Sequence, residues 1–309
     1  MKPQTSNIYC VHFDQTVKKY ATKNFWKHGQ EKHIADFLMD KMLEGNKEVT
    51  MYKYLKDLKF WQGALSKSFD ACGLQDIKEA VVHLQTLPLA ESTKQRRKIS
   101  LKVFYRWLRK CEKPEETGWI KTNMRIRRIT PPQLLLRPED ISRMLGFAKN
   151  NLERAVLMLH WESGGRVGEI LNIRIGDVLF EDQLAVIRLD GKTGPRQIYV
   201  REAYPYLEAH LSGHQQKDDN EAHLFLNAEG EPMLYYSFCR ILKRLGAEAG
   251  IRKPLNTHFF RHSRATFLAR KGWSEAQLCT HLGWVYGSAM PRTYIHMAGS
   301  DLREAVLNL

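Results

Sequence analysis

Apolar side chains recur at three- and four-residue intervals through residues 31–110, which is the spacing of one face of an α-helix. Ser92 and Gln95 form a capping-box pattern that marks the start of the last of these helices. The pattern therefore predicts a small bundle of four helices. Its apolar stripes are Ile34–Met42, Tyr54–Leu65, Ile77–Leu84 and Ile99–Leu108.

The helical spacing stops on both sides of this bundle. Residues 1–30 show no strong periodicity, and we interpret them as a loose arm that Phe25 and Trp26 could dock. Residues 111–136 are punctuated by prolines and carry clustered arginines, which is typical of an interdomain linker. We therefore expect an N-terminal helical domain over 1–113, a basic linker over 114–136 and a C-terminal domain over 137–309.

The C-terminal part begins with helical patterns. Pro138 is followed by two acidic residues, which is a helix-start signature, and a second helix is expected over 152–163. Two glycines then break the helix, and a new one is expected from about Arg166, with Glu169 on the same face. Further helices are predicted over 235–248, from a cap at Thr257, from a capping box at Ser274–Gln277, and over 300–307.

Residues 178–200 form the clearest strand region. Leu184–Leu189 and Gln197–Val200 flank a Gly-containing turn, which is typical of a β-hairpin with Lys192 at its tip. A third short strand is expected at His223–Leu226. The expected fold class is therefore mainly α with a small antiparallel β-sheet, an α+β arrangement.

The net charge is +14, and its distribution is uneven. Residues 1–130 hold 26 Lys and Arg against 14 Asp and Glu, whereas the remainder is nearly neutral. Such a basic part suggests a polyanion partner, although a solvated helix face and a flexible tether would look the same. The candidate DNA-binding residues are Lys94, Arg96, Arg97, Lys98, Lys102 and Arg106 on the fourth helix, and Arg125, Arg127 and Arg128 in the linker.

Several classes of protein are disfavoured by what the chain lacks. No apolar run approaches the roughly 20 residues of a membrane span, and the first residues have no signal-peptide core. The five scattered cysteines form no CxxC pair, which fits reduced thiols in the cytoplasm. Neither an acidic cluster suited to Mg²⁺ nor a P-loop is present, so we expect chemistry without metal, ATP or other cofactor.

The residues with the most chemistry lie between Leu255 and Tyr294. This stretch contains His258-x-x-Arg261-His262 and Leu282-Gly283-Trp284 before it reaches the tyrosine. An arginine holds phosphate oxygens in a fork, a histidine moves protons, and a tyrosine oxygen can attack. Taken singly, each of these residues is more often an ordinary structural one.

Five motifs that follow one another in the chain make a functional interpretation of these residues more specific than any single motif does. They are Ser163-Gly164-Gly165-Arg166 with Glu169, Gly191-Lys192, His258-x-x-Arg261-His262, Leu282-Gly283-Trp284 and Tyr294-Ile295-His296. Behind a basic helical bundle, this constellation resembles the tyrosine recombinase, or phage integrase, family over about residues 65–309. Position 284 is Trp where His is more usual, and the Trp284–Tyr294 interval is one residue longer than the commonest spacing. Tyr286 is therefore a second candidate nucleophile, and Tyr294 is preferred.

The resemblance implies the roles of these residues. Tyr294 would attack the phosphodiester, Arg166 and Arg261 would bind its oxygens, and Trp284 would donate a hydrogen bond. His258 would act as base and Lys192 as leaving-group acid. Glu169 and His262 would hold these groups in orientation without contacting the reacting atoms themselves.

The resemblance also implies the fold and the activity. An N-terminal SAM-like, core-DNA-binding bundle would precede a tyrosine-recombinase catalytic domain. The protein would be a site-specific recombinase or integrase of a mobile element that cleaves double-stranded DNA through a 3′-phosphotyrosine link. It would act as a tetramer, with the helix at 300–308 docking on a neighbour, in the cytoplasm of a prokaryotic or viral host cell and at its nucleoid. A type IB topoisomerase-like nicking-closing enzyme and a non-catalytic DNA-binding relative remain as alternatives.

Overall fold

The computed structural model describes Trp26 and residues 31–122, 132–191 and 193–299, the side chains of Glu31, Pro132 and 296–299 excepted. The described chain folds as two compact units, one within Val11–Arg128 and one within Ile129–Leu309. Each unit is treated below by itself. No helix among the described residues is long and apolar enough to span a bilayer.

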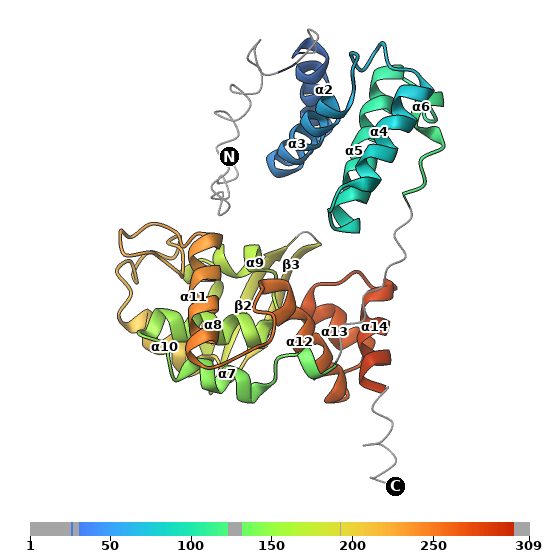
Figure 1. Ribbon diagram of the computed structural model, residues 1–309. Coiled ribbons are helices and arrows are strands. Elements are labelled where there is room, and N and C mark those ends of the chain that lie inside the picture. Colours follow the sequence, from blue (N-terminus) through green and yellow to red (C-terminus); the bar gives the residue numbers. More distant parts are fainter. Residues whose placement is uncertain (1–25, 27–30, 123–131, 192, 300–309) are drawn as a thin grey trace. The chain divides into compact units, whose positions relative to one another are not determined.

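The N-terminal unit is helical, as the apolar spacing predicts (Figure 1). The expected four-helix bundle is present, and a short fifth helix follows it among the residues that the structure describes. These helices are α2 (Glu31–Leu43), α3 (Glu48–Ala64), α4 (Leu74–Thr86), α5 (Glu91–Arg109) and α6 (Glu115–Gly118).

The core of this unit is aromatic. Phe37 and Phe104 meet edge to face with ring centroids 5.2 Å apart, and Trp61 is fully buried in the same cluster. Trp26 is buried in the same cluster, so its expected docking is confirmed, whereas Phe25 lies outside the described residues. Ile120 also packs in this core, so the start of the expected linker belongs to the N-terminal unit.

One local prediction in this unit is wrong. The helix α5 begins at Glu91 with Ala90 as its N-cap, so Ser92 already lies inside the helix and caps nothing. Gln95 instead donates a hydrogen bond to the Glu91 carboxylate across one helical turn. The Ser-x-x-Gln spacing alone could not reveal that the helix starts earlier.

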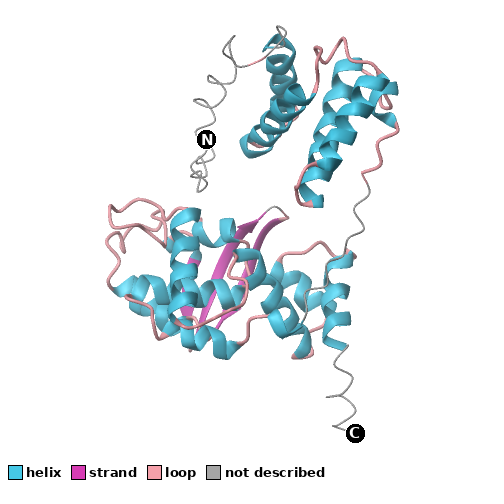
Figure 2. Ribbon diagram, in the orientation of Figure 1, coloured by secondary structure: helices cyan, strands magenta, loops and turns pink. Residues whose placement is uncertain are grey.

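The C-terminal unit combines helices with one three-stranded antiparallel sheet, coloured magenta in Figure 2. Its strands are β1 (Val178–Glu181), β2 (Leu184–Gly191) and β3 (Gly194–Val200), in that spatial order. Its helices are η1 (Pro132–Leu134), α7 (Pro138–Leu145), α8 (Asn151–Ser163), α9 (Val167–Leu171), η2 (Ile175–Asp177), α10 (Tyr204–Ser212), α11 (Tyr235–Glu248), α12 (Thr257–Arg270), α13 (Glu275–Leu282) and α14 (Ala289–Gly299).

Helix α8 is the centre of this unit. Every residue from Ala155 to Ser163 is buried, because α7, α10, α12 and the sheet surround the helix. Leu135 and Leu136 join the same core, so the end of the expected linker belongs to this unit. A separate small cluster at the C-terminal end contains Trp284 and Tyr294.

The sequence predictions for this unit are partly confirmed. The hairpin, the start at Pro138, the helix 235–248 and the Ser274–Gln277 capping box are present. The strand expected at His223–Leu226 is wrong, because this segment makes only isolated bridges at its two ends. Thr257 is the first helical residue, and Asn256 provides the cap instead. The helix expected at 300–307 lies outside the described residues.

Candidate active site

Tyr294 is the most enclosed of the candidate residues. It lies on α14, is only 2% exposed, and its ring stacks on Trp284 at 5.1 Å with an interplanar angle of 10°. Its hydroxyl is hydrogen-bonded to Nδ1 of His262 on α12. Burial raises the pKa of the phenol to about 12, although the positive charge of Arg261 acts in the opposite direction. The hydroxyl is therefore protonated at neutral pH and needs a base to react.

Arg261 lies beside this pair and is 7% exposed. Its Nη1 donates to the Gly164 carbonyl at 2.9 Å and its Nη2 to the Leu282 carbonyl at 2.6 Å. Both carbonyls stand at helix ends, where they lack an intrahelical partner. Burial and the nearby Arg166 lower the pKa of the guanidinium to about 10, so it remains charged at neutral pH.

The guanidinium of Arg261 also lies over the indole of Trp284, 5.3 Å from the ring centroid. Trp284 also stacks on Tyr294. The side chains of Arg261, Trp284 and Tyr294, from three segments, therefore form one continuous group. Trp284 is placed by the turn at Gly283, which ends α13 in the left-handed conformation at φ +62°. The motif Leu-Gly-Trp thus delivers both a carbonyl for Arg261 and a ring for Tyr294.

Arg166 is the N-cap residue of α9, and its side chain is about one-third exposed, at 32%. Its Nη1 contacts Glu169 Oε1 at 2.7 Å, and its backbone N–H donates to Oε2 at 3.0 Å. The pair expected from the three-residue spacing is therefore confirmed as a side-chain ion pair. Arg166 remains accessible to an anion from solvent, whereas Glu169 is buried behind it.

Arg196 on β3 completes this group, and sequence reasoning missed it. Its Nη2 contacts Glu169 Oε2 at 2.8 Å, and its Nε donates to the His281 carbonyl at 3.0 Å. Its side chain is only 8% exposed. Arginine contacts lower the pKa of Glu169 despite its burial, so the carboxylate stays ionised. The Glu169 carboxylate thus links Arg166 to Arg196 on β3, and Arg196 in turn contacts the end of α13.

Two glycines make room for this ionic contact. A Cβ on Gly191 would lie 2.4 Å from Glu169 Oε1, and one on Gly283 would lie 2.6 Å from Arg196 Nη1. Thr193, at the hairpin turn, donates to the Gly283 carbonyl at 3.2 Å. The hairpin turn and the Leu-Gly-Trp segment are therefore held directly against each other.

Residues 135–300 match the family model of the phage integrase family, and residues 34–112 match that of the phage integrase N-terminal SAM-like domain. The chain belongs to the phage integrase family. The expected family, its mainly helical fold with a small antiparallel sheet, and its SAM-like N-terminal part are confirmed.

Curated relatives of this phage integrase family member are distant. Transposase A from transposon Tn554 of Staphylococcus aureus is 25% identical over 189 residues, which cover 55% of this chain and 50% of the transposase. Tyrosine recombinase XerD of Oceanobacillus iheyensis is 27% identical over 180 residues, which cover 55% of this chain and 60% of XerD. The chain thus spans about half the length of the transposase relatives that it matches.

Solved structures of the family share the fold. The XerH site-specific recombinase bound to palindromic difH substrate gives a TM-score of 0.67 at 18% identity, over 95% of this chain and 94% of XerH. A lambda integrase dimer bound to a COC′ core site gives 0.65 at 16% identity, over 85% of this chain and 76% of the integrase. At such identities the likeness establishes the fold.

The other predicted site residues are less closely grouped. His258 is exposed on α12, one turn before His262, and it is His262 that contacts the Tyr294 hydroxyl. Tyr286, the second candidate nucleophile, is 65% exposed, and its hydroxyl bonds to Thr280 at 2.7 Å. Lys192 lies outside the described residues.

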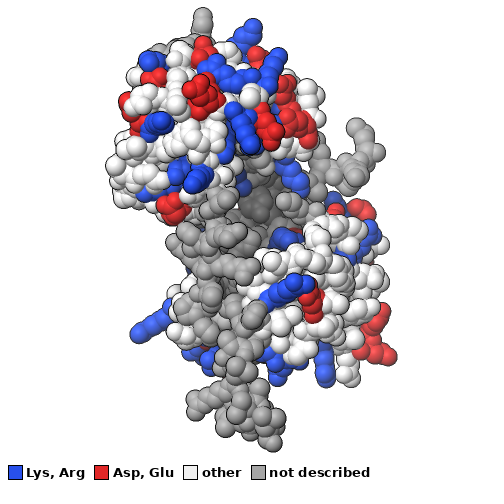
Figure 3. Space-filling view, turned by 90° about the vertical axis from the view of Figure 1, so that its right-hand side faces the viewer, with Lys and Arg blue, Asp and Glu red and all other residues white. Residues whose placement is uncertain are grey.

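The candidate DNA-binding residues of α5 differ in accessibility. Lys98 is 7% exposed, which argues against a direct phosphate contact, whereas Arg106 is exposed. Lys94 and Lys102 donate to main-chain carbonyls, each at 2.7 Å. On the face of the N-terminal unit seen in Figure 3, acidic side chains stand among the basic ones. Arg125, Arg127 and Arg128 lie outside the described residues.

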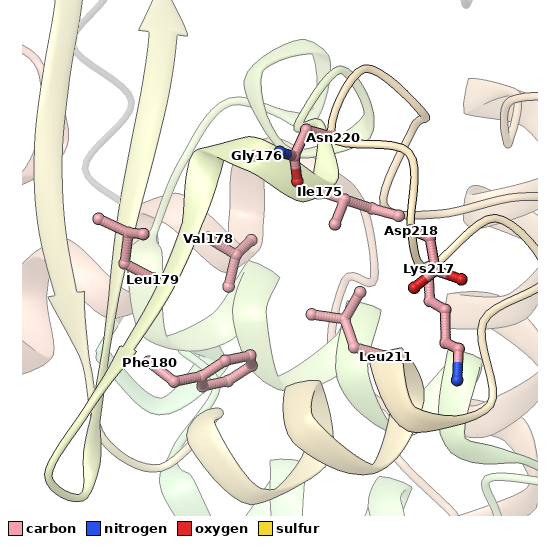
Figure 4. A pocket seen from close by; sticks show the side chains of 9 residues that line it. All are labelled: Ile175, Gly176, Val178, Leu179, Phe180, Leu211, Lys217, Asp218 and Asn220. Carbon is pink, nitrogen blue, oxygen red and sulfur yellow. The ribbon is translucent and has the colours of Figure 1, made fainter.

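A hollow elsewhere in the C-terminal unit is separate from this group (Figure 4). It has a volume of ≈ 400 Å³ and lies between the β1 edge of the sheet and the end of α10. Phe180 and Leu211 give it apolar walls, and Lys217 and Asp218 stand at its rim. It shares no lining residue with the Tyr294 group and offers no constellation suited to phosphate chemistry.

Proposed function

We propose that the protein is a site-specific DNA recombinase that breaks and rejoins DNA through a covalent link to Tyr294. One observation carries the proposal: a buried tyrosine hydroxyl bonds to an imidazole within a group that also holds a buried arginine. Membership of the phage integrase family supports it, because the group is built from the family's motifs.

The arginines supply the charge that the reaction needs. A phosphodiester under attack gathers negative charge on its non-bridging oxygens, and fixed guanidinium groups neutralise it in the transition state. Arg261 is held by two neutral carbonyls, so its positive charge remains available for a ligand. Arg166 is partly exposed, and its charge lies near enough to lower the pKa of Arg261. Since two cations serve this role, we propose a reaction that needs no metal ion or cofactor.

The remaining roles follow from the family motifs. The Tyr294 oxygen would form a bond to phosphorus while the bond to the 5′-oxygen breaks, which leaves a 3′-phosphotyrosyl link. Lys192 would protonate the leaving oxygen, and Trp284 would donate a hydrogen bond to a phosphate oxygen. A histidine of the His258-x-x-Arg261-His262 motif, by resemblance His258, would take the phenolic proton. Glu169 and Arg196 would hold Arg166 in place.

The assembly on DNA is also proposed. A lambda integrase has been solved as a tetramer bound to a Holliday junction, and the fold is shared. We propose that four protomers join two duplexes, that residues 300–308 dock on a neighbouring protomer, and that the protein works at the nucleoid. Arg106, Arg125, Arg127 and Arg128 would contact the DNA backbone, whereas Arg96 and Arg97 are held by Asp57 and Phe60 of their own unit.

The experiment begins by finding the DNA site. Wild-type protein is incubated with sheared DNA of the source organism, covalent complexes are trapped in EDTA and denaturant, and the attached DNA is sequenced. A nicked duplex carrying that site then serves as suicide substrate. Tyr294→Phe should abolish the covalent complex and retain DNA binding, whereas the matched control Tyr286→Phe should behave as wild type.

Three outcomes would contradict parts of the proposal. No covalent complex with any DNA would favour a non-catalytic DNA-binding protein. Complexes that persist in Tyr294→Phe and vanish in Tyr286→Phe would reassign the nucleophile. Relaxation of supercoiled DNA by cleavage-competent protein that never exchanges strands would favour a topoisomerase-like enzyme.

A further inference from the structure

The two histidines of the His258-x-x-Arg261-His262 motif have different surroundings. They stand one helical turn apart on α12, so both face the same side of the helix. Both residues are exposed, but only His262 has its Nδ1 hydrogen-bonded to the Tyr294 hydroxyl. The family motif does not predict this difference, which arises from the packing of α14 against α12.

The direction of this hydrogen bond follows from the chemistry of its partners. The phenol keeps its proton, because burial raises its pKa to about 12, so the hydroxyl is able to donate. Nδ1 accepts when the imidazole is neutral and carries its proton on Nε2. Desolvation lowers the pKa of His262, and the positive charges of His258 and Arg261 act in the same direction. The ring is therefore neutral at pH 7 and has a lone pair aimed at the phenolic proton.

The surroundings of Tyr294 keep the two groups aligned. The phenol ring is clamped by its stack on Trp284, and the ring planes of His262 and Tyr294 are tilted by 38° with centroids 5.6 Å apart. The carbonyl of His262 accepts a hydrogen bond from Thr266 at 3.0 Å inside the regular helix α12. Proton transfer from the phenol to Nδ1 thus needs no rearrangement of either helix.

We propose that His262, and not His258, is the general base for Tyr294. The inference rests on the proposed function. During cleavage the Tyr294 oxygen bonds to phosphorus, its proton passes to Nδ1 of His262, and the 5′-oxygen leaves with a proton from a separate acid. During rejoining the 5′-hydroxyl attacks phosphorus, its proton returns to that acid, and the imidazolium gives its proton back to the departing Tyr294 oxygen.

The division of labour leaves His258 a different task. As an exposed imidazole on the same face, it can donate a hydrogen bond to a non-bridging phosphate oxygen. Its loss would then weaken phosphate binding in the transition state without removing the path for the phenolic proton. The two histidines are therefore separable by experiment.

The test is single-turnover cleavage of a nicked suicide substrate carrying the trapped site. His262→Asn places an amide oxygen near the position of Nδ1, so the hydrogen bond survives while proton acceptance is lost. We expect cleavage to slow by about 10²–10⁴-fold, with DNA affinity and thermal unfolding close to wild type. His258→Asn is the matched control one turn away, and it should lose much less.

A second substrate separates base from acid. When sulfur replaces the bridging 5′-oxygen, the leaving group no longer needs an acid. That substrate should restore cleavage by Lys192→Ala and should leave His262→Asn slow.

His262→Gly should regain activity with added imidazole, because His262 stands at the protein surface. The wild-type rate should rise with pH through the pKa of His262, which burial and the positive charges of His258 and Arg261 lower and which the neutral Tyr294 hydroxyl faces. This rise should be missing in His262→Asn.

Cleavage by His262→Asn within a few-fold of wild type would overturn the inference, as would rescue of that variant by the sulfur substrate. If His262→Asn fails to fold, the imidazole rescue of His262→Gly decides the question. These outcomes leave the proposed function intact, because that fails only if wild-type protein forms no covalent complex or Tyr294→Phe still forms one.

Discussion

Helices α5 and α12 both carry arginines, and these arginines have different partners. On α5, Arg96 contacts the buried Asp57 at 2.7 Å, and the guanidinium of Arg97 lies 3.6 Å over the Phe60 ring. On α12, Arg261 makes its hydrogen bonds to two neutral carbonyls. These two α5 arginines stabilise their own unit, whereas Arg261 forms no ion pair with any residue that the structure describes.

This difference shows why a count of basic residues does not locate a binding site. The fourth helix of the N-terminal unit has the richest run of Lys and Arg, yet much of that run contacts its own unit. Arg261 stands in a nearly neutral half of the sequence and is held where an oxyanion would be stabilised. Availability of charge depends on the partner of each cation, and partners are set by tertiary packing.

The largest expected effect is at Arg261. Arg261→Ala removes the buried cation and leaves two carbonyls unpaired, so cleavage of the suicide substrate should fall by about 10²–10³-fold or more. Arg96→Ala, the matched change on α5, should leave the cleavage rate within a few-fold of wild type. Equal losses in the two variants would break the distinction between the helices.

Arg196→Met should have the next largest effect. It breaks the contact with buried Glu169, and breaking such a pair typically costs about 3–5 kcal/mol. Thermal unfolding should therefore shift down, and cleavage should slow because Arg166 loses its support. Adding Glu169→Gln should recover part of the stability without restoring cleavage. A double variant no more stable than Arg196→Met would argue against the pairing.

The two units should also differ in their response to acid. His281 is buried with its Nε2 3.1 Å from the Glu162 carbonyl, and burial lowers its pKa to about 4. The unfolded chain takes up this proton near pH 6.5, so the native state is favoured above that pH and loses the advantage as pH falls toward 4. The loss amounts to roughly 3 kcal/mol, and the buried His160 acts in the same direction.

Hydrogen exchange followed segment by segment at pH 7.5, 6 and 5 would measure this effect in the whole protein. Protection of α8 and α12 should fall as the pH is lowered, while α3 and α5 should change less. His281→Asn should flatten the response of the C-terminal unit. An acid response of the same size in both units would contradict this account.

The smallest effect is expected on α5 itself. Arg106 is exposed, so Arg106→Ala should weaken DNA binding by only a few-fold and reduce the slope of log affinity against log salt by about 1. Lys98→Met, at a buried position, should leave the slope unchanged. Binding titrations at several salt concentrations would show whether exposure, as opposed to sequence position, selects the contacts.

What the sequence predicts well is local. The capping box at Ser274 and Gln277 involves neighbours three residues apart, and the structure contains it. Helix α14 was not among the predicted elements. Its Pro291 stands in the first turn, where proline is tolerated because it removes no helical hydrogen bond. The strand at His223–Leu226 has strand-like residues but no neighbour along its length.

The candidate site illustrates the same limit. The motif order identified Arg166, Arg261, Trp284 and Tyr294, and the last three form one contact group. Arg196 joins Glu169 across 27 residues of sequence, and His262 joins Tyr294 across 32. Neither pairing has a local signal, since each depends on which elements pack together.

The stacking of Tyr294 also decides which phenol is vulnerable to reagents in solution. Tyr286 is 65% exposed and Tyr294 is 2% exposed, eight residues apart on the same chain. A nitrating agent would modify Tyr286 first and spare the proposed nucleophile while α14 stays closed on α12. The rate of nitration at Tyr294 would therefore report how often α14 moves away from α12.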